Sequence, residues 1–260
     1  MAELILRREG PVATVLFSNL AKHNAVSHDM WKRFPELMGE LDRDASVRVI
    51  VIAGDGEKAF ISGADISQFE KVRAGGDAQA EYNRAVERAY DAPPQVSKPV
   101  IAKIRGICFG GGLGLAAACD LRIAAEDAVF RMPAARLGLG YNFTGMRRFM
   151  AVLGPAHTAD IFYSARKFDA REALAMGFVS RVLPVAELER EVAAYCATVA
   201  ENAPLTIAAG KYAIRQLQKD PAERDVAGVE RRVMACYDSA DYKEGRTAFM
   251  EKRVPRFEGK

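Results

Sequence analysis

The sequence predicts an α/β core followed by a helical C-terminal region. Over the first part of the chain, short apolar runs of strand length alternate with helical patterns, whereas helical patterns alone follow residue 202. A run of three glycines, Gly110-Gly111-Gly112, also joins an apolar stretch of strand length to a helix start made of small residues. We therefore expect a core over residues 1–202 and a helical region over residues 203–260.

Strands are expected where short apolar runs rich in β-branched residues lie between turn residues. The run from Arg48 to Ala53 is nearly continuous in apolar residues, which is typical of a strand covered on both faces. The turn Glu9-Gly10-Pro11 separates the first two strands. The expected strands are 4–8, 12–17, 48–53, 100–104, 121–125, 128–131 and 177–182.

Helices are expected where apolar residues recur at helical spacing. Ser27 is expected to N-cap the first helix, whose apolar face consists of Met30, Phe34, Leu37, Met38 and Leu41. Because proline disfavours helical backbone at the preceding residue, Asp91-Ala92-Pro93-Pro94 is expected to end a long polar helix over 67–90, which Gly75-Gly76 loosens. Further helices are expected over 144–153, 156–164, 170–176, 185–202, 205–218, 221–239 and 241–253.

The composition argues against several classes of protein. The 260 residues include 37 basic and 34 acidic residues that are interspersed along the chain, so no nucleic-acid partner is expected. No apolar stretch reaches the roughly 18 residues that a membrane span requires. The N-terminus has no secretory layout, and the four cysteines lack metal-like spacing. We expect a cytoplasmic protein with reduced cysteines and no membrane partner.

The three glycines are expected to form an anion-stabilising turn. A helix that starts at such a turn presents unpaired N–H groups and the positive end of its dipole. Gly112-Leu113-Gly114-Leu115-Ala116-Ala117 also matches the spacing of a dinucleotide-binding turn, but Asp120 comes too early for the acidic partner of that motif. These residues alone are compatible with two ligands of the turn, a phosphate or an oxyanion.

Other catalytic constellations find little support. No Gly-x-Ser-x-Gly sequence occurs, which argues against a serine nucleophile on a strained elbow. The three histidines, His23, His28 and His157, lie in loops or at helix starts without an obvious acidic partner. We therefore expect no metal site.

Motifs along nearly the whole chain resemble the enoyl-CoA hydratase/isomerase (crotonase) family. They are Asn24-Ala25, Ala59-Phe60-Ile61-Ser62-Gly63-Ala64-Asp65-Ile66, Lys98-Pro99-Val100-Ile101-Ala102, Gly106, the glycine triplet, Cys119-Asp120, Ala173, Met176-Gly177-Phe178-Val179, Phe249 and Glu251-Lys252-Arg253. The resemblance implies a crotonase-like spiral of ββα units with C-terminal helices that assemble trimers, often paired into hexamers. It also implies an acyl-CoA ligand, with coenzyme A as part of the substrate and no separate cofactor.

The resemblance assigns an oxyanion hole to the backbone N–H groups of Ala64 and Gly111. In the family, two such donors clasp the thioester oxygen and stabilise an enolate. By the same resemblance, substrate contacts are expected from Lys22, Ala25, Ser62, Asp65, Ile66, Gly110, Tyr141, Asn142, Phe249 and Lys252. Phe249 and Lys252 are expected to reach the coenzyme A of a neighbouring subunit. Ser67 stands where the family often has a basic residue, and Lys22 is the expected substitute.

The chain departs from the family at its acid/base positions. Gly114 and Ala134 occupy the positions of the two hydratase glutamates, and Asn142 occupies the position where other members have an aspartate. We expect Gly114 and Ala134 to leave empty volume near the acyl group. Tyr141 and Asn142 are the catalytic candidates: Tyr141 as a proton donor, and Asn142 as a hydrogen-bond donor to water or carbonyl.

Two functions are consistent with this pattern. The first is an acyl-CoA lyase or isomerase of hydratase/isomerase type with an altered acid/base set, which the retained oxyanion hole favours. The alternative is a non-catalytic acyl-CoA binder or carrier, which the missing carboxylates favour.

Overall fold

The computed structural model describes residues 2–65 and 76–260. Its strands are β1 (Glu3–Glu9), β2 (Val12–Ser18), β3 (Val49–Gly54), β4 (Ala59–Ile61), β5 (Val100–Ile104), β6 (Ile107–Phe109), β7 (Leu121–Ala125), β8 (Val129–Arg131), β9 (Lys167–Asp169) and β10 (Arg181–Leu183). Within these residues the larger sheet has the order β1-β2-β3-β5-β7-β10, and only β1 and β2 pair antiparallel. The smaller sheet has the order β4-β6-β8-β9, with β8 and β9 antiparallel.

Three successive segments follow the same plan. Each places one strand in the larger sheet and the next in the smaller sheet, and then continues into a helix: α3 (Gly76–Gln95), α4 (Gly111–Ala118) or α5 (Phe143–Ser164). These are the units β3-β4-α3, β5-β6-α4 and β7-β8-α5. The expected spiral of ββα units is thereby confirmed. Its consequence is that β4 and β6, parallel neighbours, release the chain at the same edge of the smaller sheet.

The larger sheet is buried on both faces, as its apolar strands require. Ile50 and Ile52 of β3 join the main core with α1 (His28–Arg43), while Val49 and Val51 pack toward α7 (Leu188–Ala200). The Ser27 hydroxyl accepts a hydrogen bond from Met30 N (3.3 Å), which confirms the predicted N-cap of α1. The two expected helices over 144–153 and 156–164 are the halves of α5, separated by a kink at Gly154 (φ 69°, ψ 177°).

The predicted end of the long polar helix was wrong. Helix α3 continues through Pro93 and Pro94 to Gln95. Proline removes a donor but keeps its carbonyl, and the last turn is closed by Val96 N on Ala92 O (3.3 Å). Residues 67–75 of the predicted helix lie outside the described part of the chain.

The predicted strand over 177–182 was also misplaced. The N–H groups of Gly177, Phe178 and Val179 bond carbonyls of α6 (Ala170–Ala175), at 2.8–3.2 Å, and therefore do not join the sheet. Strand β10 begins only at Arg181. The three-residue strands β4, β6 and β9 were not predicted, because so short a run carries no readable alternation.

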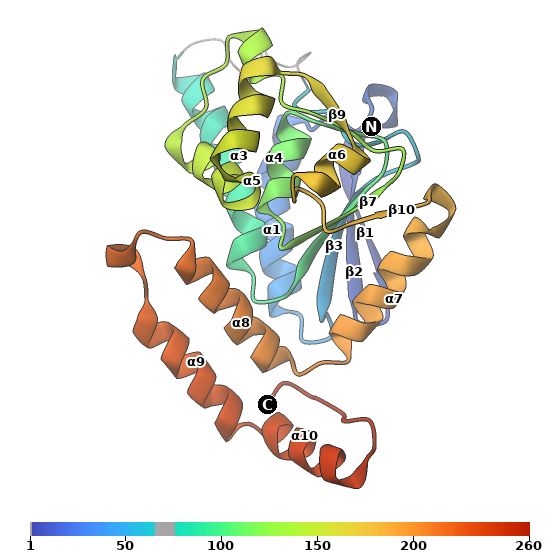
Figure 1. The fold of residues 1–260 in the computed structure, drawn as a ribbon, viewed down its shortest axis with the longest axis vertical. Coiled ribbons are helices and arrows are strands. Elements are labelled where there is room, and N and C mark those ends of the chain that lie inside the picture. Colours follow the sequence, from blue (N-terminus) through green and yellow to red (C-terminus); the bar gives the residue numbers. More distant parts are fainter. Residues whose placement is uncertain (1, 66–75) are drawn as a thin grey trace.

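The C-terminal region consists of α8 (Pro204–Leu217), α9 (Val226–Asp238) and α10 (Ala240–Glu251), which extend as an arm away from the two sheets (Figure 1). Short 3₁₀ turns lie at Leu20–Lys22, Ala134–Leu137, Val185–Glu187 and Pro221–Glu223. Lys211 of α8, 9% exposed, anchors the arm to the core. Its ammonium donates to Asp120 Oδ2, Pro93 O and Lys98 O, each at 2.7 Å. Asp120 also accepts from Val100 N (2.7 Å), so its role is structural.

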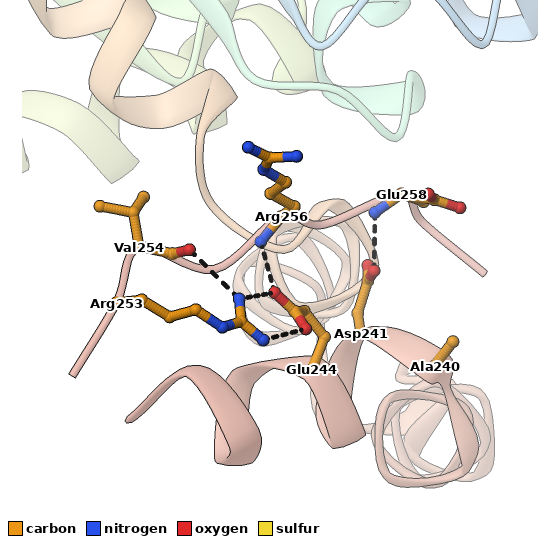
Figure 2. A pocket seen from close by; sticks show the side chains of 7 residues that line it. All are labelled: Ala240, Asp241, Glu244, Arg253, Val254, Arg256 and Glu258. Carbon is orange, nitrogen blue, oxygen red and sulfur yellow. Dashed lines mark hydrogen bonds and ion pairs between the residues drawn. The ribbon is translucent and has the colours of Figure 1, made fainter. Parts of the chain in front are cut away.

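The chain after α10 folds back onto that helix (Figure 2). The Asp241 carboxylate accepts hydrogen bonds from Glu258 N (2.7 Å) and Gly259 N (2.9 Å). Glu244 accepts from the Arg253 guanidinium (2.6 and 2.9 Å). These groups border a hollow of about 910 Å³, and they are already engaged in holding the tail. In the described residues, we find no helix that combines the length and apolarity needed to cross a membrane.

Candidate functional site

Two backbone N–H groups meet where β4 and β6 end. Ala64 follows β4, and Gly111 follows β6 as the first residue of α4. The two positions are close, since a methyl group added at Gly111 would lie 3.6 Å from Ala64 N. Neither N–H donates to another described residue. The structure therefore brings the two predicted donors together and leaves both available to one acceptor.

The local backbone explains why these N–H groups are free. Val26 N donates to Gly63 O (2.8 Å) and Asp65 N to Val26 O (2.9 Å), which directs the Ala64 N–H away from this bridge. The backbone of Gly63 has φ 125°, and that of Gly110 has φ 49° with ψ −111°. Residues that carry a Cβ rarely adopt these backbone conformations. The glycine requirement that the sequence indicated is thus a requirement for the turn that aims the two donors.

Both donors line a cavity of about 480 Å³ between α1, α3 and α5. Its wall mixes aromatic rings with charged and amide side chains. The lining residues are Trp31, Ala64, Gln79, Tyr82, Asn83, Val86, Glu87, Tyr90, Asp91, Gly111, Leu139, Gly140, Tyr141, Asn142, Thr144, Gly145 and Arg148. This volume and this mixed lining are typical of a pocket for a small-molecule ligand.

Tyr90 fills the space beside Gly114, contrary to the expectation of empty volume there. A Cβ added at Gly114 would lie 2.8 Å from both Cζ and the hydroxyl oxygen of Tyr90. The ring packs edge-on against Trp31 (5.6 Å between ring centroids), and its hydroxyl donates to Gly111 O (3.2 Å). Burial raises the pKa of the Tyr90 hydroxyl well above its usual range, so it stays a neutral donor. A tyrosine from α3 thus occupies the space beside Gly114.

Ala134 leaves no empty volume in the cavity either. It begins the 3₁₀ turn Ala134–Leu137, is 5% exposed, and packs in the main core. It is not among the described residues that line the cavity. The expectation of spare room at this position was wrong, because the core closes over the small side chain.

Tyr141 and Asn142, the two catalytic candidates, both line the cavity. The Tyr141 ring packs against Phe162 (4.9 Å) and Phe149 (6.3 Å), and burial raises the pKa of its hydroxyl to about 12. Asn142 N-caps α5 through Oδ1, which accepts from Gly145 N (2.8 Å). Its amide nitrogen donates to Glu87.

The sequence analysis missed the charged residues of the cavity. Glu87 and Asp91 come from α3, and Arg148 comes from α5. Arg148 pairs with Asp91 (3.1 Å) and lies over the Tyr90 ring, 5.2 Å from its centroid. The spacing of Glu87, Tyr90 and Asp91 puts them on one helix face, a signal that was readable in the sequence.

The residues expected at the coenzyme A end form a separate group. Lys22 Nζ pairs with the buried Asp65 carboxylate at 2.9 and 3.1 Å, and Ser62 Oγ donates to Lys22 O (3.0 Å). Ala25 is buried, and its carbonyl accepts from Asn19 (2.8 Å). None of these residues, nor Gly110, is among the described residues that line the cavity. Ile66 and Ser67 lie outside the described residues.

Phe249 and Lys252 lie far from the cavity within one chain. Phe249 is on α10, and Lys252 ends that helix, in the arm that extends away from α3 and α5 (Figure 1). Phe249 is 82% exposed. Their proposed contact with coenzyme A therefore depends on a second copy of the chain. Among the described residues, no cluster of three His, Cys, Asp or Glu side chains is arranged to hold a metal ion.

Known proteins resemble this chain over nearly its full length. The enoyl-CoA hydratase/isomerase family model matches residues 7–260. The short-chain-enoyl-CoA hydratase of Clostridium acetobutylicum is 30% identical over 250 residues, 96% of this chain and 95% of that protein. Carnitinyl-CoA dehydratase of Salmonella typhi is 33% identical over 262 residues, 99% and 98% of the two chains.

A solved structure gives the same result. That of an enoyl-CoA hydratase/carnithine racemase from Magnetospirillum magneticum superposes with a TM-score of 0.93 at 35% identity, over 100% of this chain and 97% of that one. A match of this length and depth, on a chain that carries the family's fold, makes this protein a member of the enoyl-CoA hydratase/isomerase (crotonase) family.

Proposed function

We propose that this protein binds acyl-CoA thioesters and stabilises an enolate at the N–H groups of Ala64 and Gly111. The observation that carries this proposal is the pair of unbonded N–H groups converging on one cavity. Such a pair is suited to a thioester oxygen that becomes negative during reaction, and one donor typically contributes about 2.7–4 kcal/mol to lowering the barrier. Relatives named for enoyl-CoA and carnitinyl-CoA substrates support the same ligand class.

The acyl group occupies the cavity of about 480 Å³, and the coenzyme A follows the edge formed by Lys22, Ala25, Ser62, Asp65 and Gly110 in this proposal. Lys22 is 46% exposed along its side chain, so its ammonium can meet a phosphate from the solvent side while Asp65 holds it in place. No separate cofactor takes part.

The chemistry is hydratase- or isomerase-like with an altered acid/base set. Because Gly114 and Ala134 carry no carboxylate, proton transfer has to come from other cavity residues. Tyr141 acts as the proton donor in this proposal, since the residue lines the cavity and a hydroxyl pKa of about 12 keeps it protonated. A positioned acid or base contributes about 10²–10⁴-fold to rate.

The second candidate is a non-catalytic acyl-CoA binder. It is favoured by the loss of carboxylates at positions 114, 134 and 142 and by the Tyr90 ring that fills the first of them. It requires binding of the thioester without conversion.

One experiment separates the two functions. Crotonyl-CoA, decenoyl-CoA and carnitinyl-CoA are incubated with the protein, products are measured by mass spectrometry, and binding is measured by calorimetry. Turnover that falls in Tyr141→Phe supports the enzyme. Saturable binding of all three thioesters with no product supports the binder, and absence of binding contradicts both.

We also propose that the arm over residues 203–260 assembles the chain into trimers or hexamers. Phe249, Met250 and Val254 are 82%, 79% and 76% exposed, a cost that burial against another copy removes. This assembly is what would bring Phe249 and Lys252 to the coenzyme A of a neighbour. Sedimentation at micromolar concentration tests it, and a monomer mass contradicts it.

A further inference from the structure

Helix α3 supplies the cavity with the carboxylates that the family's usual positions lack. Glu87 and Asp91 lie one turn apart on the helix face that also carries Tyr90. Tyr90 occupies the space beside Gly114 and touches the carbonyl of Gly111, so this face of α3 borders the oxyanion hole directly. Glu87 is less than one turn from Tyr90, about 4.5 Å along the helix axis.

Asn142 holds Glu87 in a defined position. The N-terminus of α5 fixes the Asn142 side chain, because Oδ1 of Asn142 accepts a hydrogen bond from Gly145 N (2.8 Å). The amide nitrogen of Asn142 is then directed toward Glu87. That nitrogen donates to Glu87 Oε1. The second carboxylate oxygen, Oε2, accepts no hydrogen bond from a described residue. Asn142 has no carboxylate of its own, and its amide instead orients the carboxylate of Glu87.

Asp91 differs from Glu87 in its partner. Its carboxylate pairs with the Arg148 guanidinium (3.1 Å), which also covers the Tyr90 ring. Glu87 has no cation partner in the described part of the chain. Of these two carboxylates in the cavity wall, Asp91 is paired with a cation of the described residues and Glu87 is not. The Glu87 carboxylate is thus the one that can interact with a ligand.

We infer that Glu87 is the catalytic base of this site and that Asn142 is its positioning residue. The inference rests on the proposed acyl-CoA function. Glu87 Oε2 takes a proton from the carbon next to the thioester carbonyl. The C–H electron pair forms the enolate double bond, and the carbonyl π pair moves to the oxygen held by Ala64 N and Gly111 N. Return of the proton from the Glu87 carboxylic acid restores the thioester.

The test incubates the protein with butyryl-CoA or octanoyl-CoA in D₂O. NMR then measures the rate at which deuterium replaces the α-protons of the acyl group. Glu87→Gln keeps an oxygen acceptor for Asn142 but cannot take a proton, so exchange is expected to fall about 10²–10⁴-fold with thioester binding unchanged. Glu81→Gln is the matched control, because Glu81 is an exposed carboxylate on the same helix outside the cavity lining. Its exchange rate is expected to equal that of the wild type.

Asn142→Ser separates positioning from folding. Serine preserves the N-cap of α5 but does not present an amide to Glu87. Exchange is expected to slow while thioester binding stays unchanged, because the Glu87 carboxylate loses the amide donor that orients it. The other titratable groups facing the cavity, Tyr82, Tyr90, Asp91, Tyr141 and Arg148, are unchanged in this variant.

The outcomes separate this inference from the proposed function. Wild-type exchange that persists in Glu87→Gln overturns the role of Glu87 and leaves the acyl-CoA enzyme standing. Thioester binding by the wild type without any exchange overturns both the base and the enzyme, and supports the binder. An exchange rate in Asn142→Ser equal to that of the wild type contradicts the positioning role alone, and so does slower exchange accompanied by an equal loss of thioester binding.

Discussion

The close packing of Tyr90 beside Gly114 can be tested by substitution of the glycine. In Gly114→Ala, the new Cβ would lie 2.8 Å from Cζ and the hydroxyl oxygen of Tyr90 and 3.2 Å from Cε2. The ring has little room to retreat, since Trp31 packs against it and its hydroxyl bonds Gly111 O. The substitution therefore forces an overpacked contact in the wall of the cavity.

The expected magnitude follows from two opposing effects. Overpacking of a tight site costs about 1–3 kcal/mol, whereas alanine within a helix is favoured over glycine by about 0.8–1.0 kcal/mol. Gly114→Ala should thus lower the free energy of unfolding by about 0–2 kcal/mol. In a Tyr90→Leu background the clash is gone, and the same substitution should raise the free energy by up to about 1 kcal/mol.

The assay is urea unfolding of the four proteins of this cycle at one protein concentration. Gly39→Ala in α1 is the matched control, because its Cβ would meet only Arg43 Nη1, at an ordinary 3.5 Å. Its effect should be the same in both backgrounds. If Gly114→Ala also had equal effects in both backgrounds, within about 0.3–0.5 kcal/mol, the two residues would be independent and the reasoning refuted.

Two further predictions concern groups that burial has shifted or paired. Burial raises the pKa of the Tyr141 hydroxyl from 10.0 to about 12, so the folded state keeps a proton that the unfolded state loses above pH 10. The free energy of unfolding should therefore fall as the pH rises from 10 toward 12, and less steeply in Tyr141→Phe, as measured by urea titrations at several pH values. Lys211→Met leaves Pro93 O and Lys98 O without their donor and should lower the free energy of unfolding by about 1–3 kcal/mol. Lys243→Met changes an exposed lysine of α10 and should alter it by less than about 0.5 kcal/mol, and equal effects would contradict the anchoring role.

Local sequence signals predicted much of this fold. The buried run in β3, the Ser27 cap and the glycine turn each depend on a few adjacent residues, and all three are present. The close approach of Tyr90 to Gly114 depends instead on how α3 packs against α4, across 24 positions of sequence. The glycine at position 114 was visible in the sequence, but the side chain that packs beside it was not.

The errors have the same origin. Pro93 and Pro94 normally end a helix, yet α3 passes through them, because its final carbonyls meet Val96 N and the Lys211 ammonium. Glu87 was not singled out within the predicted long polar helix, since its partner Asn142 lies 55 positions away. Local pattern identified which residues are apolar or turn-forming, while partners from distant segments decided which polar residues face the cavity.

The Lys211 ammonium also connects the arm to the cavity mechanically. It grips Pro93 O in the last turn of α3, three residues beyond Tyr90, while its own backbone belongs to α8. The same ammonium therefore fixes the end of the helix that carries the cavity residues Glu87, Tyr90 and Asp91 relative to the start of the arm.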